Sequence, residues 1–330
     1  MHKWFLSGLC AGALALPLVL HALSRTLLGA QDKNSEWVAE AVRRKGEIAS
    51  QTTTPQILLV GGSNVNLGYS AAQIMREFSV PATNLAAHAG LGRRYIFWDC
   101  LRYAKRGDLV VLALEYGLYG HLFYDPAERY QAFIYDRTYY ELLAWREKFY
   151  LLGGLSPGDW AVLWRAKAGW PRVATNGGYA MVLNERGDQT DNARPHVRLY
   201  KAPSVQELVD PQFGRDLSEF AHAVRQRGAS VVLAFPNLLD AAFRQRVTPA
   251  FVADLRRAAD TAGVRVVGTP EESAFPAEYV YDTIYHLNAA GTQIATRRLV
   301  RQLREAGIEL PSTAGANYFP AQKSARVWRP

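Results

Sequence analysis

Short apolar runs constrain the fold of this chain more than any other feature of its sequence. Residues 57–60, Ile-Leu-Leu-Val, are continuously apolar and lead directly into Gly61 and Gly62. A short run without polar alternation is typical of a strand that is buried on both faces, and the paired glycines predict a tight turn after it. Similar apolar runs occupy residues 108–114, 230–235 and 264–267.

A predicted helix precedes each of these later runs and ends near Gly107, Gly228 or Gly263. Glycine is favoured just after the last turn of a helix, because it adopts the left-handed conformation without strain. Strands that alternate with helices predict a central parallel sheet covered on both faces. We therefore expect a flavodoxin-like, three-layer α/β/α fold.

The chain has 330 residues and 49% hydrophobic content, which suffices for one α/β domain with an insertion. We expect an N-terminal segment over residues 1–30, a linker over 31–55 and the folded domain over 56–330. Between about residues 117 and 211 the alternation stops and aromatic residues accumulate. This predicts an insertion that caps the carboxyl edge of the sheet. Its aromatic side chains favour either a small core of their own or a surface for a membrane or a partner.

The N-terminal segment is strongly apolar. Between Trp4 and Leu23, His21 is the sole residue with an ionisable basic or acidic side chain, and this stretch is long enough to cross a hydrocarbon layer of about 30 Å. We expect an uncleaved transmembrane helix that anchors the protein to a membrane. A cleaved signal peptide is the alternative, for which Leu-Gly-Ala at residues 28–30 is a weak cleavage signal.

Charge and cysteine content exclude several classes of protein. The 38 basic and 30 acidic residues give a net charge of +8, but the basic residues are scattered, which predicts a solvated surface and no nucleic-acid partner. Cys10 lies in the apolar N-terminal segment and Cys100 on a predicted core-facing helix, so we expect no disulfide. Without clustered His and Cys residues, we predict no metal and no cofactor.

Ser63 follows the two glycines where the first predicted strand ends. Open parallel sheets bind their ligands at this carboxyl edge, which favours a reactive serine. The glycines permit a sharp turn and a close approach of substrate, and the Ser63 N–H is suited to face a developing oxyanion. Such turns also bind phosphate or simply reverse the chain, so the turn does not by itself identify a nucleophile.

An acid and a histidine lie near the other end of the chain, on a predicted loop before the last helix. Asp282 and His286 are four residues apart, and Asn288 is the expected N-cap of that helix. A serine hydroxyl needs a base to accept its proton, and that base needs an acceptor that fixes its tautomer. The sequence therefore predicts Ser63 as nucleophile, His286 as base and Asp282 as the orienting acid.

These features resemble the SGNH (GDSL-like) hydrolase superfamily. Residues 57–64 resemble its first block, a Gly-Asp-Ser turn after the first strand, with Gly62 replacing the usual Asp. Residues 84–92 resemble its second block, in which a glycine N–H helps to form the oxyanion hole. The resemblance implies Gly90 as this donor, with Ala89 as the alternate. It covers roughly residues 55–116 and 215–307.

The third block departs from the family, which usually has Gly-x-Asn-Asp where this chain has Leu-Glu-Tyr-Gly at residues 114–117. The family's Asn donates a hydrogen bond to the oxyanion, whereas an ionised Glu115 can only accept one. Tyr116 and Asn64 are candidates for a replacement donor, and Glu115 is a candidate for orienting another residue. In the last block, the acid lies one residue further from the histidine than is usual in the family.

Two more residues adjoin the predicted site. His88 lies near the expected oxyanion turn, where it either contacts substrate or serves as a hydrogen-bonded structural histidine. Asn237 follows the strand predicted at residues 230–235, where it either lines the pocket or belongs to a turn. Residues 184–188, Asn-Glu-Arg-Gly-Asp, predict a turn within the insertion.

We expect serine-dependent acyl transfer by an SGNH-type esterase or O-acyltransferase, in which water or a sugar hydroxyl takes the acyl group from Ser63. The resemblance implies O-acetylation or deacetylation of an extracytoplasmic polysaccharide by a periplasmic domain, with a multi-spanning membrane acyltransferase as partner. A second interpretation is a non-catalytic scaffold of a membrane polysaccharide-modification complex. A third, a phosphate-binding flavodoxin-like domain, leaves the Asp282 and His286 pair unexplained and lacks a P-loop lysine.

Overall fold

The computed structural model describes residues 36–120, 136–146, 148, 156–168, 182–193 and 208–311, with isolated positions between 15 and 26. Most of the expected N-terminal anchor therefore lies outside the described residues. Within the described part of the chain, no helix is both long enough and apolar enough to span a bilayer.

Five parallel strands form the central sheet. They are β1 (Ile57–Gly61), β2 (Ala82–Asn84), β3 (Leu109–Ala113), β4 (Ser230–Ala234) and β6 (Arg265–Val267). They lie in the order β2-β1-β3-β4-β6, and every pairing is parallel. This is the 2-1-3-4-5 order of flavodoxin-like, doubly wound sheets. The predicted parallel sheet is thus confirmed, and each predicted apolar run contains one of its strands.

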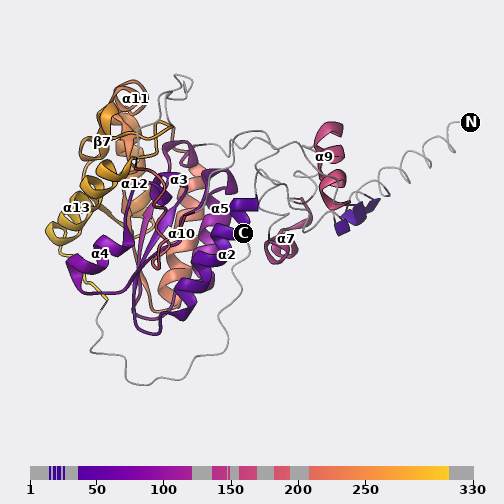
Figure 1. The fold of residues 1–330 in the computed structure, drawn as a ribbon, viewed down its shortest axis with the longest axis horizontal. Helices are drawn as coiled ribbons and strands as arrows, with labels where there is room; N and C mark the ends of the chain where they lie inside the picture. The colour runs from indigo at the N-terminus through magenta and orange to yellow at the C-terminus, as the bar shows by residue number, and fades with distance from the viewer. Residues whose placement is uncertain are drawn as a thin grey trace, which may run out of the picture. The chain divides into compact units, whose positions relative to one another are not determined.

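Helices cover both faces of this sheet (Figure 1). The longer ones are α2 (Glu36–Gln51), α4 (Ala71–Phe78), α5 (Arg93–Tyr103), α10 (Pro211–Gln226), α12 (Pro249–Thr261) and α13 (Ala289–Glu305). Helices α4 and α13 share a hydrophobic core with one face of the strands, whereas α5, α10 and α12 pack together on the other. The shorter helical segments are α3 (Ser63–Asn66), α11 (Asp240–Arg246), η1 (Ala89–Leu91), η2 (Tyr116–Leu118), η3 (Glu271–Ser273) and η4 (Ala277–Tyr279). A separate parallel pair joins β5 (Leu238–Leu239) to β7 (Ala274–Phe275).

Local sequence signals explain where these helices begin and end. The side chains of Ser70, Asp210, Thr248 and the predicted cap Asn288 each accept a backbone hydrogen bond at a helix N-terminus. At the helix ends, Gly107, Gly228 and Gly263 have φ values of +83°, +73° and +65°. These left-handed conformations are the ones for which glycine was expected.

The chain divides into two compact units, one comprising Met1–Ala39, Tyr124–Tyr179 and Arg329–Pro330, the other Glu40–Phe123 and Ala180–Trp328. The sheet belongs to the second. In the first, α7 (Arg137–Leu142) and α9 (Pro157–Lys167) are described. The aromatic residues there have mixed surroundings, because Tyr139 and Tyr140 are buried while Trp145 and Trp164 are 54% and 42% exposed.

The ends of the predicted insertion meet within the sheet unit. The Asp210 N–H donates to the Tyr119 carbonyl at 2.9 Å. Beside them, the buried Arg93 guanidinium donates to the carbonyls of Leu118 and Gly120 and pairs with Asp216 at 2.7 Å. These contacts join the two ends of the insertion, beside η2 and the start of α10.

Candidate active site

The two glycines after β1 lie where no side chain fits. A Cβ on Gly61 would lie 2.3 Å from the Ala113 carbonyl oxygen of β3. A Cβ on Gly62 would lie 2.3 Å from Oε2 of Glu115. Because real Cβ atoms do not approach other atoms this closely, the glycines let β1 turn tightly beside the end of β3 and begin α3 at Ser63.

The Glu115 carboxyl binds the beginning of α3. Its Oε1 accepts hydrogen bonds from Ser63 Oγ at 3.1 Å and from the Asn64 N–H at 2.9 Å. Glu115 is 4% exposed, and its Oε2 has no hydrogen-bond partner among the described residues. Burial raises the pKa of Glu115, while the hydrogen bond from the Asn64 N–H is the largest influence in the opposite direction. Glu115, which occupies the position of the family's donor Asn, is therefore an acceptor for the serine itself.

Asp282 and His286 lie together, as their spacing suggested. Asp282 Oδ1 is 2.6 Å from Nδ1 of His286, and the Tyr281 N–H donates to the His286 carbonyl at 2.8 Å across the loop. His286 is 6% exposed. When Nδ1 donates to a carboxylate, the lone pair of a neutral imidazole is on Nε2, which is the state that a general base needs.

Hydrogen bonds tie this loop to the Ser63 turn. The Leu287 N–H donates to the Leu67 carbonyl at 3.3 Å, and Thr292 Oγ1 donates to the same oxygen at 3.0 Å. Ser63 and Glu115 are thus hydrogen-bonded at the carboxyl edge of the sheet, and the loop that pairs His286 with Asp282 is hydrogen-bonded to Leu67, which follows α3.

The second block carries a neutral histidine. Nδ1 of His88 accepts a hydrogen bond from the Gly90 N–H at 3.0 Å. Burial, followed by the nearby charge of His286, lowers the pKa of His88 to about 4. The ring is therefore neutral at pH 7 with its proton on Nε2. Gly90, the expected oxyanion donor, uses its N–H to cap η1 in this structure, while the alternate Ala89 is partly exposed.

Three other predicted site residues are core side chains. Asn64 is fully buried and its Nδ2 donates to the Ala113 carbonyl at 3.0 Å. Tyr116 is also fully buried, with its ring 5.4 Å from that of Phe251. Asn237 is 1% exposed and its Nδ2 donates to the Gly68 carbonyl at 3.4 Å. In this structure, these side chains offer substrate no accessible surface.

Sequence reasoning did not find the residues that stabilise the backbone around the site through hydrogen bonds. The fully buried Lys45 of α2 donates to Asn66 Oδ1 at 2.6 Å and to the Ala86 carbonyl. Burial lowers the pKa of Lys45 to about 7. A single lysine on an amphipathic helix gives no sequence signal for such a role, because exposed lysines have the same pattern.

The returning part of the insertion also supports the site. Asn192 Nδ2 donates to the Leu287 carbonyl at 2.9 Å, and the Asn192 carbonyl accepts from the Ala289 N–H at 3.0 Å. Residues 184–188 form the predicted turn, with Gly187 at φ +79° and an antiparallel bridge between Leu183 and Gln189. The insertion therefore holds the loop that carries His286.

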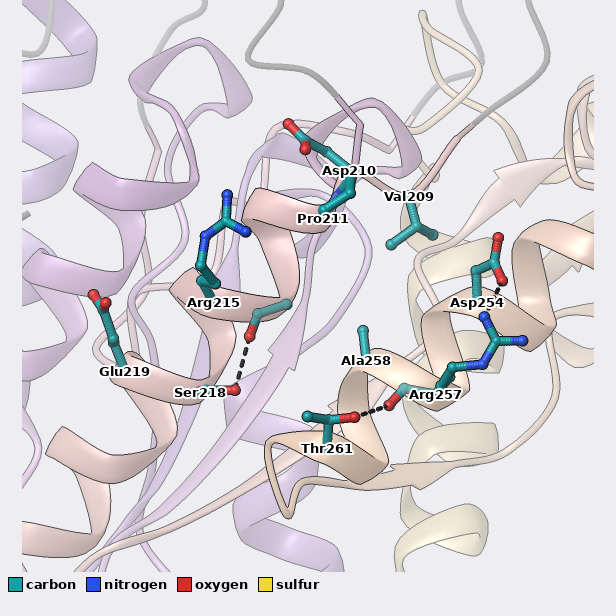
Figure 2. A pocket seen from close by; sticks show the side chains of 11 residues that line it. Val209, Asp210, Pro211, Arg215, Ser218, Glu219, Asp254, Arg257, Ala258 and Thr261 are labelled. Atoms are coloured by element: carbon teal, nitrogen blue, oxygen red, sulfur yellow. Dashed lines mark hydrogen bonds and ion pairs between the residues drawn. The ribbon is translucent and has the colours of Figure 1, made fainter.

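A pocket of about 580 Å³ lies elsewhere, between α10 and α12 (Figure 2). Among its lining residues, Arg257 pairs with Asp254 at 2.7 Å, and Ser218 Oγ donates to the backbone carbonyl of Gly214 at 2.8 Å. Neither Ser63 nor His286 lines it. Among the described residues, no group of three or more His, Cys, Asp or Glu side chains is arranged to hold a metal ion.

The fold is a doubly wound α/β fold, and its candidate site contains two hydrogen-bonded pairs, Ser63 with Glu115 and His286 with Asp282. No family model and no curated protein matches the chain. One similar solved structure is the crystal structure of protein YxiM from Bacillus subtilis. It is 15% identical with a TM-score of 0.36, and the match covers 77% of this chain and 57% of that chain. Similarity of this degree does not establish a shared family.

Proposed function

We propose that this protein is an SGNH-type esterase or O-acyltransferase that uses Ser63 as its nucleophile. The observation that supports this most is the 2.6 Å contact between Asp282 and His286, in a loop hydrogen-bonded to the Ser63 turn. It supplies the orienting acid and the base that an activated serine needs. The proposal includes the SGNH hydrolase fold over residues 56–330 and the N-terminal membrane anchor.

The reaction proceeds in two steps. In the first, Nε2 of His286 takes the proton of Ser63 as Oγ attacks the ester carbonyl, and the leaving alcohol then receives that proton. Asp282 stabilises the intervening imidazolium. In the second step, water or a sugar hydroxyl gives a proton to His286 and attacks the acyl-enzyme. The acyl group leaves and Ser63 recovers its proton.

The proposal assigns one oxyanion donor to His88. The family's Asn is absent here, the Asn64 N–H donates to Glu115, and the Gly90 N–H donates to His88. The loop that carries His88 follows β2, which pairs with β1 directly beneath the Ser63 turn. A neutral ring protonated at Nε2 can donate a hydrogen bond to the oxyanion without first taking up a proton, as an oxyanion hole requires.

We propose an extracytoplasmic carbohydrate as the substrate. The aromatic-rich composition of the insertion supports this, because aromatic faces stack on sugar rings. The apolar N-terminal segment and the family resemblance support a membrane-anchored, periplasmic location with a multi-spanning acyltransferase as partner. This part of the proposal is by analogy with the family.

A non-catalytic scaffold is the second candidate. One observation favours it, since the Ser63 hydroxyl donates to the Glu115 carboxyl in this structure. A scaffold would keep the same packing but form no acyl-enzyme. The two candidates therefore differ in chemistry that can be measured.

Turnover of 4-nitrophenyl acetate by the full-length protein in detergent tests the proposal. We expect Ser63→Ala and His286→Ala each to lower kcat/KM by about 10³-fold or more. Ser218→Ala, which removes a hydroxyl on α10, is the matched control and should leave the rate unchanged. Equal rates for Ser63→Ala and the wild type would exclude Ser63 as the nucleophile. Adding an oligosaccharide acceptor then distinguishes transfer from hydrolysis.

A further inference from the structure

We propose that Glu115 is a positioning residue for the nucleophile, and that Gly62 lacks a side chain in order to make room for the Glu115 carboxyl. This inference rests on the proposed acyl transfer and adds a resting state to it. Glu115 holds the Ser63 hydroxyl until the proton is needed by His286.

The contacts of Glu115 define this role. A single oxygen, Oε1, accepts from both the Ser63 hydroxyl and the Asn64 N–H, at 3.1 Å and 2.9 Å. One bond orients the Ser63 side chain and the other fixes the backbone that carries it. Since the carboxyl comes from the end of β3, it also sets the position of the turn relative to the sheet.

Gly62 provides the second, independent observation. The three heavy atoms nearest to a Cβ at this position are Oε2, Oε1 and Cδ of Glu115, at 2.3, 2.6 and 2.7 Å. The φ of Gly62 is −94°, outside the left-handed region that by itself favours glycine. The space that the Glu115 carboxyl occupies is therefore a reason for glycine at residue 62.

The arrangement has a consequence for reactivity. A serine hydroxyl has one proton, and the resting structure directs it to Glu115. The reaction requires the same proton to pass to His286, so the hydroxyl must turn about its Cβ–Oγ bond when substrate enters. Glu115 thus keeps the nucleophile in place in the resting site without itself accepting the proton.

Burial favours the uncharged form of the Glu115 carboxyl, and glutamine has nearly the same shape. In Glu115→Gln, the side-chain oxygen still accepts from Ser63 and Asn64. In Glu115→Asp, the carboxyl is kept but the chain is one methylene too short. Glu115→Ala removes both the hydrogen-bond acceptor and the carboxyl group. These variants separate the position of the acceptor from its charge.

The rate of covalent labelling by a fluorophosphonate measures this effect on the full-length protein. We expect Glu115→Gln to react within about threefold of the wild type, and Glu115→Asp and Glu115→Ala to react at least about tenfold more slowly while remaining folded. Equal loss in Glu115→Gln and Glu115→Ala would mean that the charge acts, which contradicts a positioning role. Wild-type rates in all three variants would contradict any role in labelling.

Melting temperatures test the role of Gly62 separately. Gly62→Ala should lower the melting temperature, and it should lower it by clearly less in the Glu115→Ala background than in the wild type. Gly61→Ala is the matched control, because its Cβ would meet the Ala113 backbone, so Glu115→Ala cannot relieve it. Additive losses for Gly62 and Glu115 would overturn the inference. If the wild-type protein is not labelled at all, acyl transfer fails, and this thermal comparison still decides whether Gly62 makes room for Glu115.

Discussion

His88 has two roles in the proposed site, and a single substitution can separate them. Its Nδ1 accepts from the Gly90 N–H and caps η1, while Nε2 carries the proton. An asparagine at this position can place its side-chain oxygen where Nδ1 lies, so His88→Asn keeps the cap and removes the Nε2 donor. This pair of functions makes His88 a test of the proposed oxyanion donor.

We predict that His88→Asn lowers kcat/KM for 4-nitrophenyl acetate by about 10²-fold, the usual effect of losing one oxyanion donor. Its melting temperature should stay near that of the wild type, whereas His88→Ala should lose the same activity and also stability. Full activity in His88→Asn would show that the oxyanion is held by other groups.

Lys45 gives the fold a pH dependence. Its pKa is lowered by burial from 10.5 to about 7 in the folded protein, whereas the unfolded chain keeps the ordinary value. Between these values the unfolded state binds more protons, so the free energy of unfolding rises with pH. Below pH 7 both states carry the proton, and the cost of burying the charge is fully present.

We predict that the free energy of unfolding of the wild type increases by up to about 1.4 kcal/mol per pH unit from Lys45 between pH 7 and 9. Lys45→Met should lack this contribution, and Lys167→Met, which changes an exposed lysine, should retain it. Urea unfolding at several pH values measures the slopes. Parallel slopes for Lys45→Met and the wild type would mean that Lys45 stays protonated throughout this range.

At the scale of elements, the N-terminus of α4 depends on a side chain from the insertion. The Asp188 carboxylate accepts from the N–H groups of Ala71 and Ala72 at 2.6 and 3.0 Å, and from Ser70 Oγ at 2.9 Å. Asp188 is 4% exposed. A negative charge at a helix N-terminus is favourable, and here it satisfies N–H groups that have no partner inside the helix.

Asp188→Ala is therefore expected to lower the free energy of unfolding by about 3 kcal/mol, since it leaves several buried donors unpaired. Asp254→Ala is the control, because Asp254 forms an exposed ion pair with Arg257 and should cost less than about 1 kcal/mol. Urea denaturation measures both. A loss for Asp188→Ala no larger than for Asp254→Ala would show that the insertion does not stabilise α4.

The elements differ in how well the sequence predicts them. Strands β1, β3 and β4 are buried on both faces over nearly their whole length, which gives the continuous apolar runs from which they were predicted. Strand β2, Ala-Thr-Asn, has no such run, so the sequence did not predict it. Its pairing with β1 depends on contacts between distant parts of the chain.

At the scale of the whole molecule, the same distinction applies to the site. Ser63, Asp282 and His286 were predicted from local patterns, a glycine turn after a strand and a short acid-to-histidine spacing. The part played by Glu115 depends on how closely the ends of β1 and β3 approach, which no local pattern specifies. The burial of Asn64, Tyr116 and Asn237 likewise depends on tertiary packing, so their roles could not be read from the sequence.

The division into two units also exceeds what the sequence specified. The predicted insertion spans about residues 117–211, but its returning part, from Ala180, belongs with the sheet. There Asp188 and Asn192 hold α4 and the His286 loop. The insertion therefore contributes to the site from within the sheet unit. It does so through polar contacts, which the pattern of hydrophobic residues in the sequence does not predict.

Covalent labelling of the full-length protein with a fluorophosphonate tests most directly the claim that His286 activates Ser63. Intact mass would detect the adduct and peptide mapping would locate it, with Ser63→Ala and His286→Ala as the informative variants. The account predicts a single adduct on Ser63 in the wild type and none in either variant. A folded wild-type protein without an adduct, or an adduct of equal yield in His286→Ala, would contradict it.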